Sequence, residues 1–308
     1  MKISVITPCF NEELNIDKCI LETVKVMEAI GQDYEHIFCD NASSDSTVAI
    51  IKEHALRDPR IKLIVNSRNV GPFRNMWIGL QNSSGDAVIP FLPADLQDPP
   101  SVIRHFVHEW KQGAQIVYGV RENRNERFLL RLSRGIYYRV IAKMSRSNIP
   151  PHVGEFLLAD RKVIDSILSV DDEYPYIRGL IAQTAIPAKY VRYTWAKRAS
   201  GKSKLGYLQL IDQGLNGFVS TTRIPARLML LVGFIAAFTG IMGAMLTAGI
   251  ILFSDVEVAP GIPTIIVGML FFGGLQMFFI GLIGEYVLSI HNQVRRSPPV
   301  YAVEKINL

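Results

Sequence analysis

The chain has 308 residues, of which 49% are hydrophobic and 20% are charged, with a formal net charge of +5. The length leaves room for one sizeable domain and an appendage, and the apolar share is high for a soluble protein. No zinc-finger spacing, recognition-helix signature or basic tail supports binding to nucleic acid, and the three cysteines have no metal-ligand spacing. Because Met1 leads straight into a strand-like run rather than a secretory signal, we expect the large domain to stay in the cytosol.

Strand-like and helix-like stretches alternate through the first 120 residues. Short apolar runs predict buried strands at 3–7, 36–39, 61–65, 87–92 and 115–118. Apolar residues at helical spacing follow them at 14–27, 48–55, toward Leu80, and at 101–110. Such alternation predicts an open, largely parallel α/β sheet covered on both faces, in which ligands bind beyond the carboxyl ends of the strands.

Polar residues follow four of these strands directly. Each pair can be explained locally, as helix caps or turn formers, but parallel strands would bring all four to one edge. No Gly-x-Gly-x-x-Gly or Walker-type loop is present, so a nucleotide would be held in another manner. The four pairs are Asn11 with Glu12, Asp40 with Asn41, Asn69 with Gly71, and Asp95 with Gln97.

The stretch from Phe91 to Pro100 holds the strongest candidate for a metal site. Asp95 and Gln97 are two residues apart, so a turn can aim both oxygens at one Mg²⁺ or Mn²⁺ ion. The alternative is a polar loop in which Asp98 caps a helix begun by prolines.

Basic residues interleave with apolar ones from 121 to 146, which predicts a helix on an anionic membrane surface. If the protein acts on a lipid phosphate, Arg121, Arg124 and Arg131 are the first candidates to meet that phosphate. The alternative is a solvated basic face over the core. A second basic loop, at 198–204, predicts either a phosphate cradle or a juxtamembrane anchor.

Two long stretches without charge lie near the end of the chain. No charged residue occurs at 228–253 or at 261–284, and about 20 apolar residues suffice to cross a bilayer. We predict an interfacial helix at 205–227, spans at 228–253 and 261–288, and a tail at 289–308. Arginines outside the pair and an acidic link inside it favour cytoplasmic outer ends. Two buried core helices are the alternative.

Together these motifs resemble family 2 glycosyltransferases, and within them the polyprenyl-phosphate type, similar to dolichol-phosphate mannose synthase and bactoprenol glucosyl transferases. The resemblance implies a GT-A catalytic domain at 1–204. It is carried by Pro8 to Glu12, Asp40 to Thr47, Asn69 to Gly71, Ala94 to Pro100, Gly154 to Arg161 and the two apolar stretches.

The resemblance also implies roles for particular residues. A nucleotide pocket would be formed by Pro8, Phe10, Glu12, Asp40 and Asn69, and a loop over the diphosphate by Arg198, Ser203 and Lys204. Asp95 and Gln97 would hold the metal, while Glu155 would lie at the reacting centre. Two positions depart from the pattern, since Pro93 and Asn41 stand where acids are common. With fewer carboxylates, water and phosphate would fill more of the metal shell.

We therefore expect an inverting transfer from a UDP-, GDP- or similar sugar donor to polyprenyl (undecaprenyl) phosphate. The reaction would take place at the cytoplasmic leaflet of the bacterial inner membrane. The rival hypothesis is a membrane scaffold or nucleotide-binding protein that has lost its chemistry. A glycan-extending synthase is disfavoured because there are only two candidate spans and no Gln-x-x-Arg-Trp motif. A homo-oligomer is left open.

Overall fold

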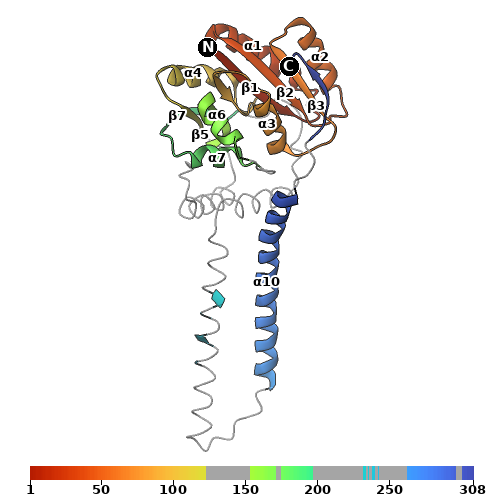
Figure 1. The fold of residues 1–308 in the computed structure, drawn as a ribbon, viewed down its shortest axis with the longest axis vertical. Coiled ribbons are helices and arrows are strands. Elements are labelled where there is room, and N and C mark those ends of the chain that lie inside the picture. The colour runs from red at the N-terminus through yellow and green to blue at the C-terminus, as the bar shows by residue number, and fades with distance from the viewer. Residues whose placement is uncertain are drawn as a thin grey trace, which may run out of the picture. The chain divides into compact units, whose positions relative to one another are not determined.

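A computed structural model describes residues 1–122, 153–170, 175–196, 262–295 and 300–308, together with 232, 233, 235, 238, 239 and 242. The chain falls into two compact units, Met1–Gly206 with Ser297–Leu308, and Tyr207–Arg296. The first contains an eight-stranded sheet, and the second contains the long helix α10 (Ile262–Arg295) (Figure 1).

The sheet has the strand order β7-β5-β6-β4-β1-β2-β3-β8. Its centre is parallel, because β1 pairs in parallel with both β2 and β4, and β2 pairs in parallel with β3. β6 is antiparallel to β4 and β5, β8 is antiparallel to β3, and β7 is parallel to β5. The strands are β1 (Lys2–Cys9), β2 (Asp33–Asp40), β3 (Ile61–Asn66), β4 (Ala87–Ile89), β5 (Ile116–Glu122), β6 (Val153–Asp160), β7 (Ala188–Thr194) and β8 (Ala302–Ile306).

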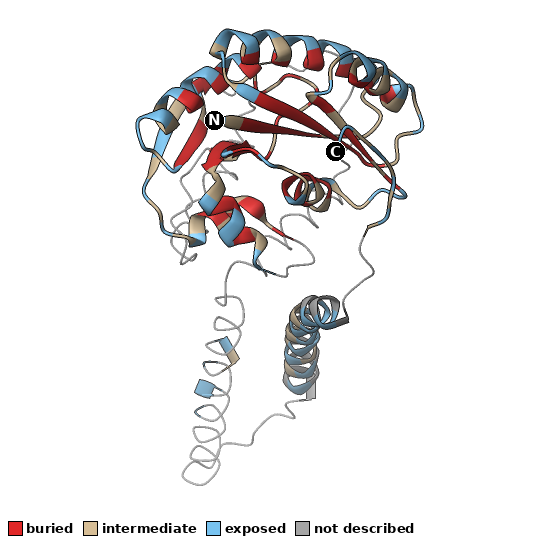
Figure 2. Cartoon of the chain, turned by 45° about the horizontal axis from the view of Figure 1, so that its top comes forward, coloured by how far each residue is buried: buried red, intermediate tan, exposed pale blue. Residues whose placement is uncertain are grey.

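Helices cover both faces of this sheet. Successive strand residues point to opposite faces, so Ile3 of β1 packs with α1 and α4 on one face while Ile6 packs with α3, α6 and α7 on the other. Figure 2 shows the buried strands between helices whose outer sides are exposed. The helices are α1 (Ile16–Ile30), α2 (Thr47–Arg57), α3 (Pro72–Gln81), the 3-10 turn η1 (Pro100–Val102), α4 (Ile103–Lys111), α6 (Arg161–Leu168) and α7 (Ile177–Gln183).

The α/β class predicted from the sequence is confirmed, and the five predicted strands correspond to β1 to β5. The sheet is mixed, however, because β6 runs against its neighbours, and β4 ends at Ile89 rather than Leu92. The sequence analysis does not predict β7 and β8, which lie at the two edges of the sheet and keep polar or exposed side chains.

β8 lies within the stretch expected to be a tail. Its antiparallel pairing with β3 is extended by a hydrogen bond from the Ser67 amide to the Tyr301 carbonyl, at 2.9 Å. Lys52 forms an ion pair with Glu304 at 2.6 Å, and Asn307 Nδ2 donates to two backbone carbonyls of the α2–β3 region. The last residues of the chain therefore belong to the sheet domain.

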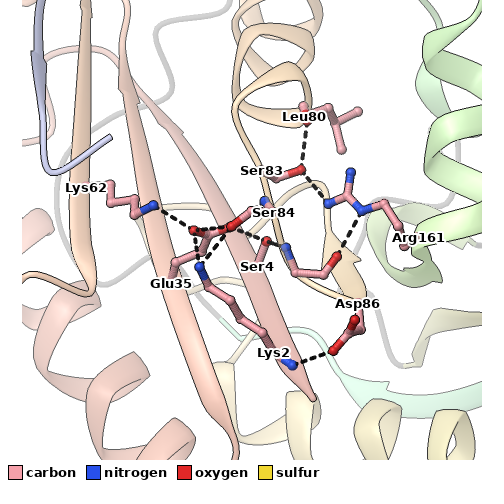
Figure 3. Close-up of polar contacts among 10 residues, drawn as sticks. Lys2, Ser4, Glu35, Lys62, Leu80, Ser83, Ser84, Asp86 and Arg161 are labelled. Carbon is pink, nitrogen blue, oxygen red and sulfur yellow. Dashed lines mark hydrogen bonds and ion pairs between the residues drawn. The ribbon is translucent and has the colours of Figure 1, made fainter.

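A closed cluster of charges lies at the amino edge of the sheet. The buried carboxylate of Glu35 forms ion pairs with Lys2 at 2.9 Å and Lys62 at 2.8 Å. It also accepts hydrogen bonds from Ser4 Oγ at 2.6 Å and the Ser84 amide at 2.7 Å (Figure 3). We call these five residues the Glu35 cluster. Both carboxylate oxygens have partners, which is what a buried charge requires.

Helix α10 is 34 residues long and exposes large apolar side chains along its length. Its side chains are described only in part. Within the described residues, no helix combines the length and apolar character that crossing a membrane requires. The two predicted spans, and the interfacial helix at 205–227, stay predictions.

Candidate functional site

The loops that leave the carboxyl edge of the sheet hold unusual backbone conformations. Asn11, Ala42 and Leu96 have φ angles of 52°, 62° and 58°, in the left-handed region that side chains other than glycine rarely adopt. They follow β1, β2 and β4. Each such residue costs about 1 kcal/mol, and conformations of this kind gather where a ligand must be met. This edge is therefore the first place to look for a site.

The loops after β1 and β2 are locked together. The amide of Asn11 donates to Ser43 Oγ at 2.8 Å, and Asn11 Oδ1 accepts from the Ser44 amide at 2.7 Å. The amide of Glu12 donates to Thr47 Oγ1 at 2.8 Å. Strand register already sets Pro8 beside Cys39 and Cys9 beside Asp40. The predicted pocket residues Pro8, Phe10, Glu12 and Asp40 thus lie on two neighbouring, cross-linked segments.

Asp40 is fully buried at the end of β2. It accepts hydrogen bonds from the backbone amide and the hydroxyl of Ser43, and the Cys9 thiol lies 3.9 Å from Oδ1. Burial raises the pKa of Asp40, while the bonds from Ser43 act in the opposite direction. These bonds fix the carboxyl group in one orientation, as an acceptor for an N–H group requires.

Asn69 reaches the same edge from the loop after β3. Its Oδ1 accepts a hydrogen bond from Asn41 Nδ2 at 2.8 Å, which connects the β3–α3 loop to the end of β2. Gly71, with φ of 80°, ends this loop, and Pro72 begins α3. A third predicted segment is thereby joined to the first two.

Asp95 lies in a turn beyond β4. The chain after β4 still runs along β1, because the Leu92 amide donates to the Ile6 carbonyl at 2.8 Å. Ala94 packs in the cluster that contains Cys9. Asp95 Oδ1 accepts a hydrogen bond from the Gln97 amide at 3.2 Å. The turn therefore stands beside the β1 loop, as the sequence predicts.

The turn offers one carboxylate and one side-chain amide to a cation. Among the described residues, no group of three or more His, Cys, Asp or Glu side chains could hold a metal ion. This donor set fits a Mg²⁺ or Mn²⁺ ion whose remaining ligands are water and substrate phosphates, rather than a cage made by protein alone. The small donor set is consistent with Pro93, which stands where an acid is common and supplies no third side-chain oxygen.

Asp98 anchors the turn from behind. The sequence alternative, that Asp98 caps a helix, is wrong, because Pro99 is the N-cap of η1 and no side chain caps it. Asp98 instead accepts from Arg121 Nε at 2.9 Å and Nη2 at 2.5 Å, and from the Tyr193 hydroxyl at 2.5 Å. Arg121 also stacks against Trp195. The Arg121 guanidinium, predicted to meet a lipid phosphate, therefore lies in a buried pair with Asp98 that fixes the Asp95 turn to β5 and β7.

Glu155 comes to the same edge on β6. Because β6 is antiparallel to β5, its first residues lie beside the carboxyl end of β5, where Val153 pairs with Val120. Gly154 packs so tightly against Arg121 that an added Cβ would lie 3.0 Å from its guanidinium. Glu155 is thus connected to the Asp95 turn through Arg121 and Asp98.

The side chain of Glu155 is partly buried, and its carboxylate is incompletely paired among the described residues. Oε1 lies 3.6 Å from Arg178 Nε, whereas Oε2 is buried without a hydrogen-bond partner among the described residues. Burial raises the pKa of Glu155, against the lowering effect of Arg178. A buried oxygen with unused capacity, close to these loops, is suited to accept a hydrogen bond from a ligand hydroxyl.

Five predicted residues lie outside the described ranges, namely Arg124, Arg131, Arg198, Ser203 and Lys204. The sequence analysis missed Asp98, Arg178 and Tyr193 as parts of the site. Asp98 belongs to the Phe91 to Pro100 stretch and its acidic side chain was a usable signal. Arg178 and Tyr193 follow no motif, so only the fold identifies them.

The mixed sheet covered by helices on both faces, with polar loops gathered at its carboxyl edge, has the GT-A type of fold. Among solved structures, the chain resembles glucosyl-3-phosphoglycerate synthase of Mycobacterium tuberculosis in complex with Mn²⁺, UDP and phosphoglyceric acid. The TM-score is 0.50 at 18% identity, covering 70% of this chain and 74% of that one. At this identity the likeness concerns the fold.

The family model for glycosyl transferase family 2 matches residues 4–168. A glycosyltransferase of Bacillus subtilis, YkcC, described as uncharacterized, is 31% identical over 99% of this chain and 94% of its own. The SfII prophage-derived bactoprenol glucosyl transferase of Shigella flexneri is 32% identical over 99% of this chain and 98% of its own. The chain belongs to glycosyl transferase family 2, and it is a glycosyltransferase.

Proposed function

We propose that this enzyme transfers a sugar from a nucleotide-sugar donor to a polyprenyl phosphate at the cytoplasmic leaflet of the bacterial inner membrane, with inversion at the anomeric carbon. The observation that carries the proposal is the match to bactoprenol glucosyl transferase over 99% of the chain. That match includes the apolar carboxy-terminal stretches, which lie beyond the family 2 domain and would have no use with a water-soluble acceptor.

The described side chains of α10 support a lipid environment for this segment. A row of large apolar side chains is exposed on one helix, a surface that water would disfavour and acyl chains would accept. The row comprises Ile265, Met269, Phe272, Met277, Ile280, Ile283, Val287, Leu288, Ile290 and Val294.

The position of β8 supports a hairpin. Ala302–Ile306 pairs with β3, so the residues before 207 and after 296 belong to one folded domain. A segment between them that enters a membrane must therefore cross it an even number of times. Two spans, at 228–253 and 261–288, satisfy this condition and agree with the charge distribution.

The site chemistry supports a direct displacement. An oxygen of the acceptor phosphate would form a bond to the anomeric carbon on the face opposite the nucleotide, while the bond to the nucleoside diphosphate breaks and its electrons leave with the diphosphate. The phosphate is already ionised near neutral pH, so no general base is needed. We assign Glu155 Oε2 to a hydrogen bond from a sugar hydroxyl, which would hold the sugar for in-line attack.

Asp95 and Gln97 would hold a divalent cation, Mg²⁺ or Mn²⁺, which neutralises charge on the departing diphosphate when bound. Asp40 and Asn69 would face the nucleoside side of the donor, on the loops already joined by hydrogen bonds. Asp98 and Arg121 would keep the turn in place without touching substrate.

The proposal is tested with purified protein, Mg²⁺ or Mn²⁺, a panel of UDP- and GDP-sugars, and undecaprenyl phosphate. A lipid-linked sugar should form with at least one donor, and not with the Asp95→Ala variant. The absence of a lipid-linked product under every combination would refute the proposal. A free lipid alcohol in place of the phosphate is the matched negative control.

The scaffold hypothesis is separated by calorimetry. An enzyme that holds its donor through Asp95 should bind a nucleoside diphosphate in a metal-dependent manner, and the Asp95→Ala variant should bind it less tightly. Identical binding by the two proteins would favour the scaffold.

A further inference from the structure

Asn41 and Asn69 form an ordered relay of hydrogen bonds at the carboxyl edge. Asn41 is 4% exposed, and its Oδ1 accepts from the Val70 amide at 2.9 Å. Its Nδ2 donates to Asn69 Oδ1 at 2.8 Å. The same Asn69 oxygen accepts from the Gly71 amide at 3.0 Å.

The direction of this relay follows from chemistry alone. A backbone amide can only donate, so the atom of Asn41 that faces Val70 must be its oxygen, and the atom that faces Asn69 must be its NH₂ group. Asn69 then meets two donors, Asn41 Nδ2 and the Gly71 amide, and must turn its oxygen toward both. That oxygen has two lone pairs, and both are used.

Asn69 is therefore left with its NH₂ group to offer, and its side chain is exposed at the edge where the nucleotide is proposed to bind. An NH₂ group donates hydrogen bonds and accepts none. Its natural partner is an acceptor-rich ligand, such as the oxygens of a nucleoside diphosphate.

We propose that Asn41 is a positioning residue that fixes the Asn69 amide with its NH₂ group outward, as a hydrogen-bond donor to the nucleoside diphosphate of the sugar donor. The inference rests on the proposed function for the identity of the ligand. It also gives a reason for an amide at position 41, where an acid is common in the resembling family. A carboxylate there accepts from Val70 but has no hydrogen for Asn69, so Asn69 would either face it oxygen to oxygen or reverse, which gives up the bond from Gly71 and presents an oxygen to the ligand.

The rest of the loop is held independently of Asn41. Asn66 Nδ2 donates to Asn75 Oδ1 at 2.8 Å, and Asn75 Nδ2 donates to the Cys39 carbonyl at 2.6 Å. The Ser67 amide donates to the Tyr301 carbonyl at 2.9 Å. Substitution of Asn41 should therefore change the amide of Asn69 without releasing the loop.

Two variants of Asn69 separate a ligand contact from a structural role. Asn69→Asp keeps an oxygen for Asn41 and Gly71 but replaces the outward donor by a second oxygen, whereas Asn69→Ala removes both. A donor role predicts that affinity falls in the order wild type, Asn69→Ala, Asn69→Asp. A purely structural role predicts that Asn69→Asp matches wild type and that Asn69→Ala is weaker.

The test is the Kd for UDP and for GDP, each with Mn²⁺, measured by calorimetry on the full-length protein in detergent. We expect about tenfold weaker binding for Asn69→Ala and for Asn41→Asp, the effect of losing one hydrogen bond to the nucleotide. In the Asn69→Ala background, Asn41→Asp should add little, because it acts through Asn69. The unfolding midpoint identifies any variant that misfolds. If Asn41→Asp misfolds, the two Asn69 variants alone decide whether Asn69 donates to the nucleotide.

The inference would be overturned, with the proposed function left intact, by either of two results. One is that the effects of Asn41→Asp and Asn69→Ala on Kd are additive in the double variant, and the other is that the Asn69→Asp variant binds nucleotide as tightly as wild type. Nucleotide binding with the expected order but no transfer to lipid phosphate would refute the proposed function and leave the relay intact. If the wild-type protein binds neither UDP nor GDP, the inference is overturned because a nucleoside diphosphate is not the partner of Asn69.

Discussion

The two edges of the sheet treat a buried glutamate in opposite ways. At the amino edge, burial alone would raise the pKa of Glu35, but hydrogen bonds from Lys62, Ser4, Ser84 and Lys2 lower it to about 2 (Figure 3). At the carboxyl edge, Glu155 has an ion pair with Arg178 at 3.6 Å and, within the described part of the chain, one oxygen without a hydrogen-bond partner, and burial raises its pKa.

The difference separates stability from function. The folded chain completes every bond to Glu35, so this charge serves the fold. Among the described residues it leaves one oxygen of Glu155 without a hydrogen-bond partner, and it holds three neighbouring loops at Asn11, Ala42 and Leu96 in left-handed conformations that cost free energy. A group that the fold leaves unsatisfied is a group whose partner is expected to arrive with the ligand.

The strongest test of the carboxyl edge is Asp95→Asn. Under the proposed function Asp95 holds a cation on the leaving diphosphate, so loss of its charge should lower the transfer rate about 10²- to 10³-fold, or roughly 3 to 4 kcal/mol. The unfolding midpoint should stay near that of wild type, since Asp95 lies in a turn that Asp98 anchors. Initial rates with a saturating nucleotide sugar measure the effect. A rate within threefold of wild type would remove Asp95 from the site.

At the amino edge, Glu35→Gln should cost about 3 kcal/mol of unfolding free energy, because two lysines lose their buried counter-ion. Urea unfolding followed by tryptophan fluorescence measures this. The direction in which stability changes with pH follows from the lowered pKa of Glu35. The stabilisation by Glu35 is complete above the unfolded value of about 4.5 and is lost as pH falls toward 2.

Glu155→Gln is the matched control, with the opposite expected sign. A raised pKa in the folded state means that folding disfavours the ionised carboxylate at neutral pH, so a neutral amide should increase the unfolding midpoint while sugar transfer falls. A decrease in midpoint equal to that of Glu35→Gln would show that the two edges do not differ.

Arg121→Lys tests the connection between the Asp95 turn and β6. Lysine keeps the charge but cannot form the paired bonds to Asp98, so the turn should be held less precisely. We expect about tenfold slower transfer, roughly 1.4 kcal/mol, with acceptor KM little changed. A raised KM for lipid phosphate at constant kcat would instead support the phosphate contact expected from the sequence.

The sequence predicts local features of this molecule well and long-range pairings poorly. Strands β1 to β5 and the loops after them are encoded in contiguous apolar runs and polar turns. The partners of Asp98, in contrast, lie 23 and 95 residues away, and those of Glu35 up to 49 residues away. β8 pairs with β3 across more than two hundred residues, which no local pattern reveals.

Asn41 shows the same limit within the site itself. From the sequence it is a departure that removes a carboxylate from a metal-like pattern. In the structure its amide accepts a hydrogen bond from the Val70 N–H group and donates one to Asn69, which explains why an amide rather than an acid suits position 41. Only the positions of two backbone amides reveal that reason.

The smallest effect is expected for Glu304→Gln in β8. Its ion pair with Lys52 is short, at 2.6 Å, but both side chains are over a third exposed, and exposed pairs contribute about 0 to 1 kcal/mol. β8 should stay in place through its pairing with β3 and the two bonds from Asn307 Nδ2. Urea unfolding should differ from wild type by less than about 0.5 kcal/mol, and less still at 1 M salt. A loss as large as that of Glu35→Gln would mean that neither exposure nor the number of partners separates the contributions of these two carboxylates to stability.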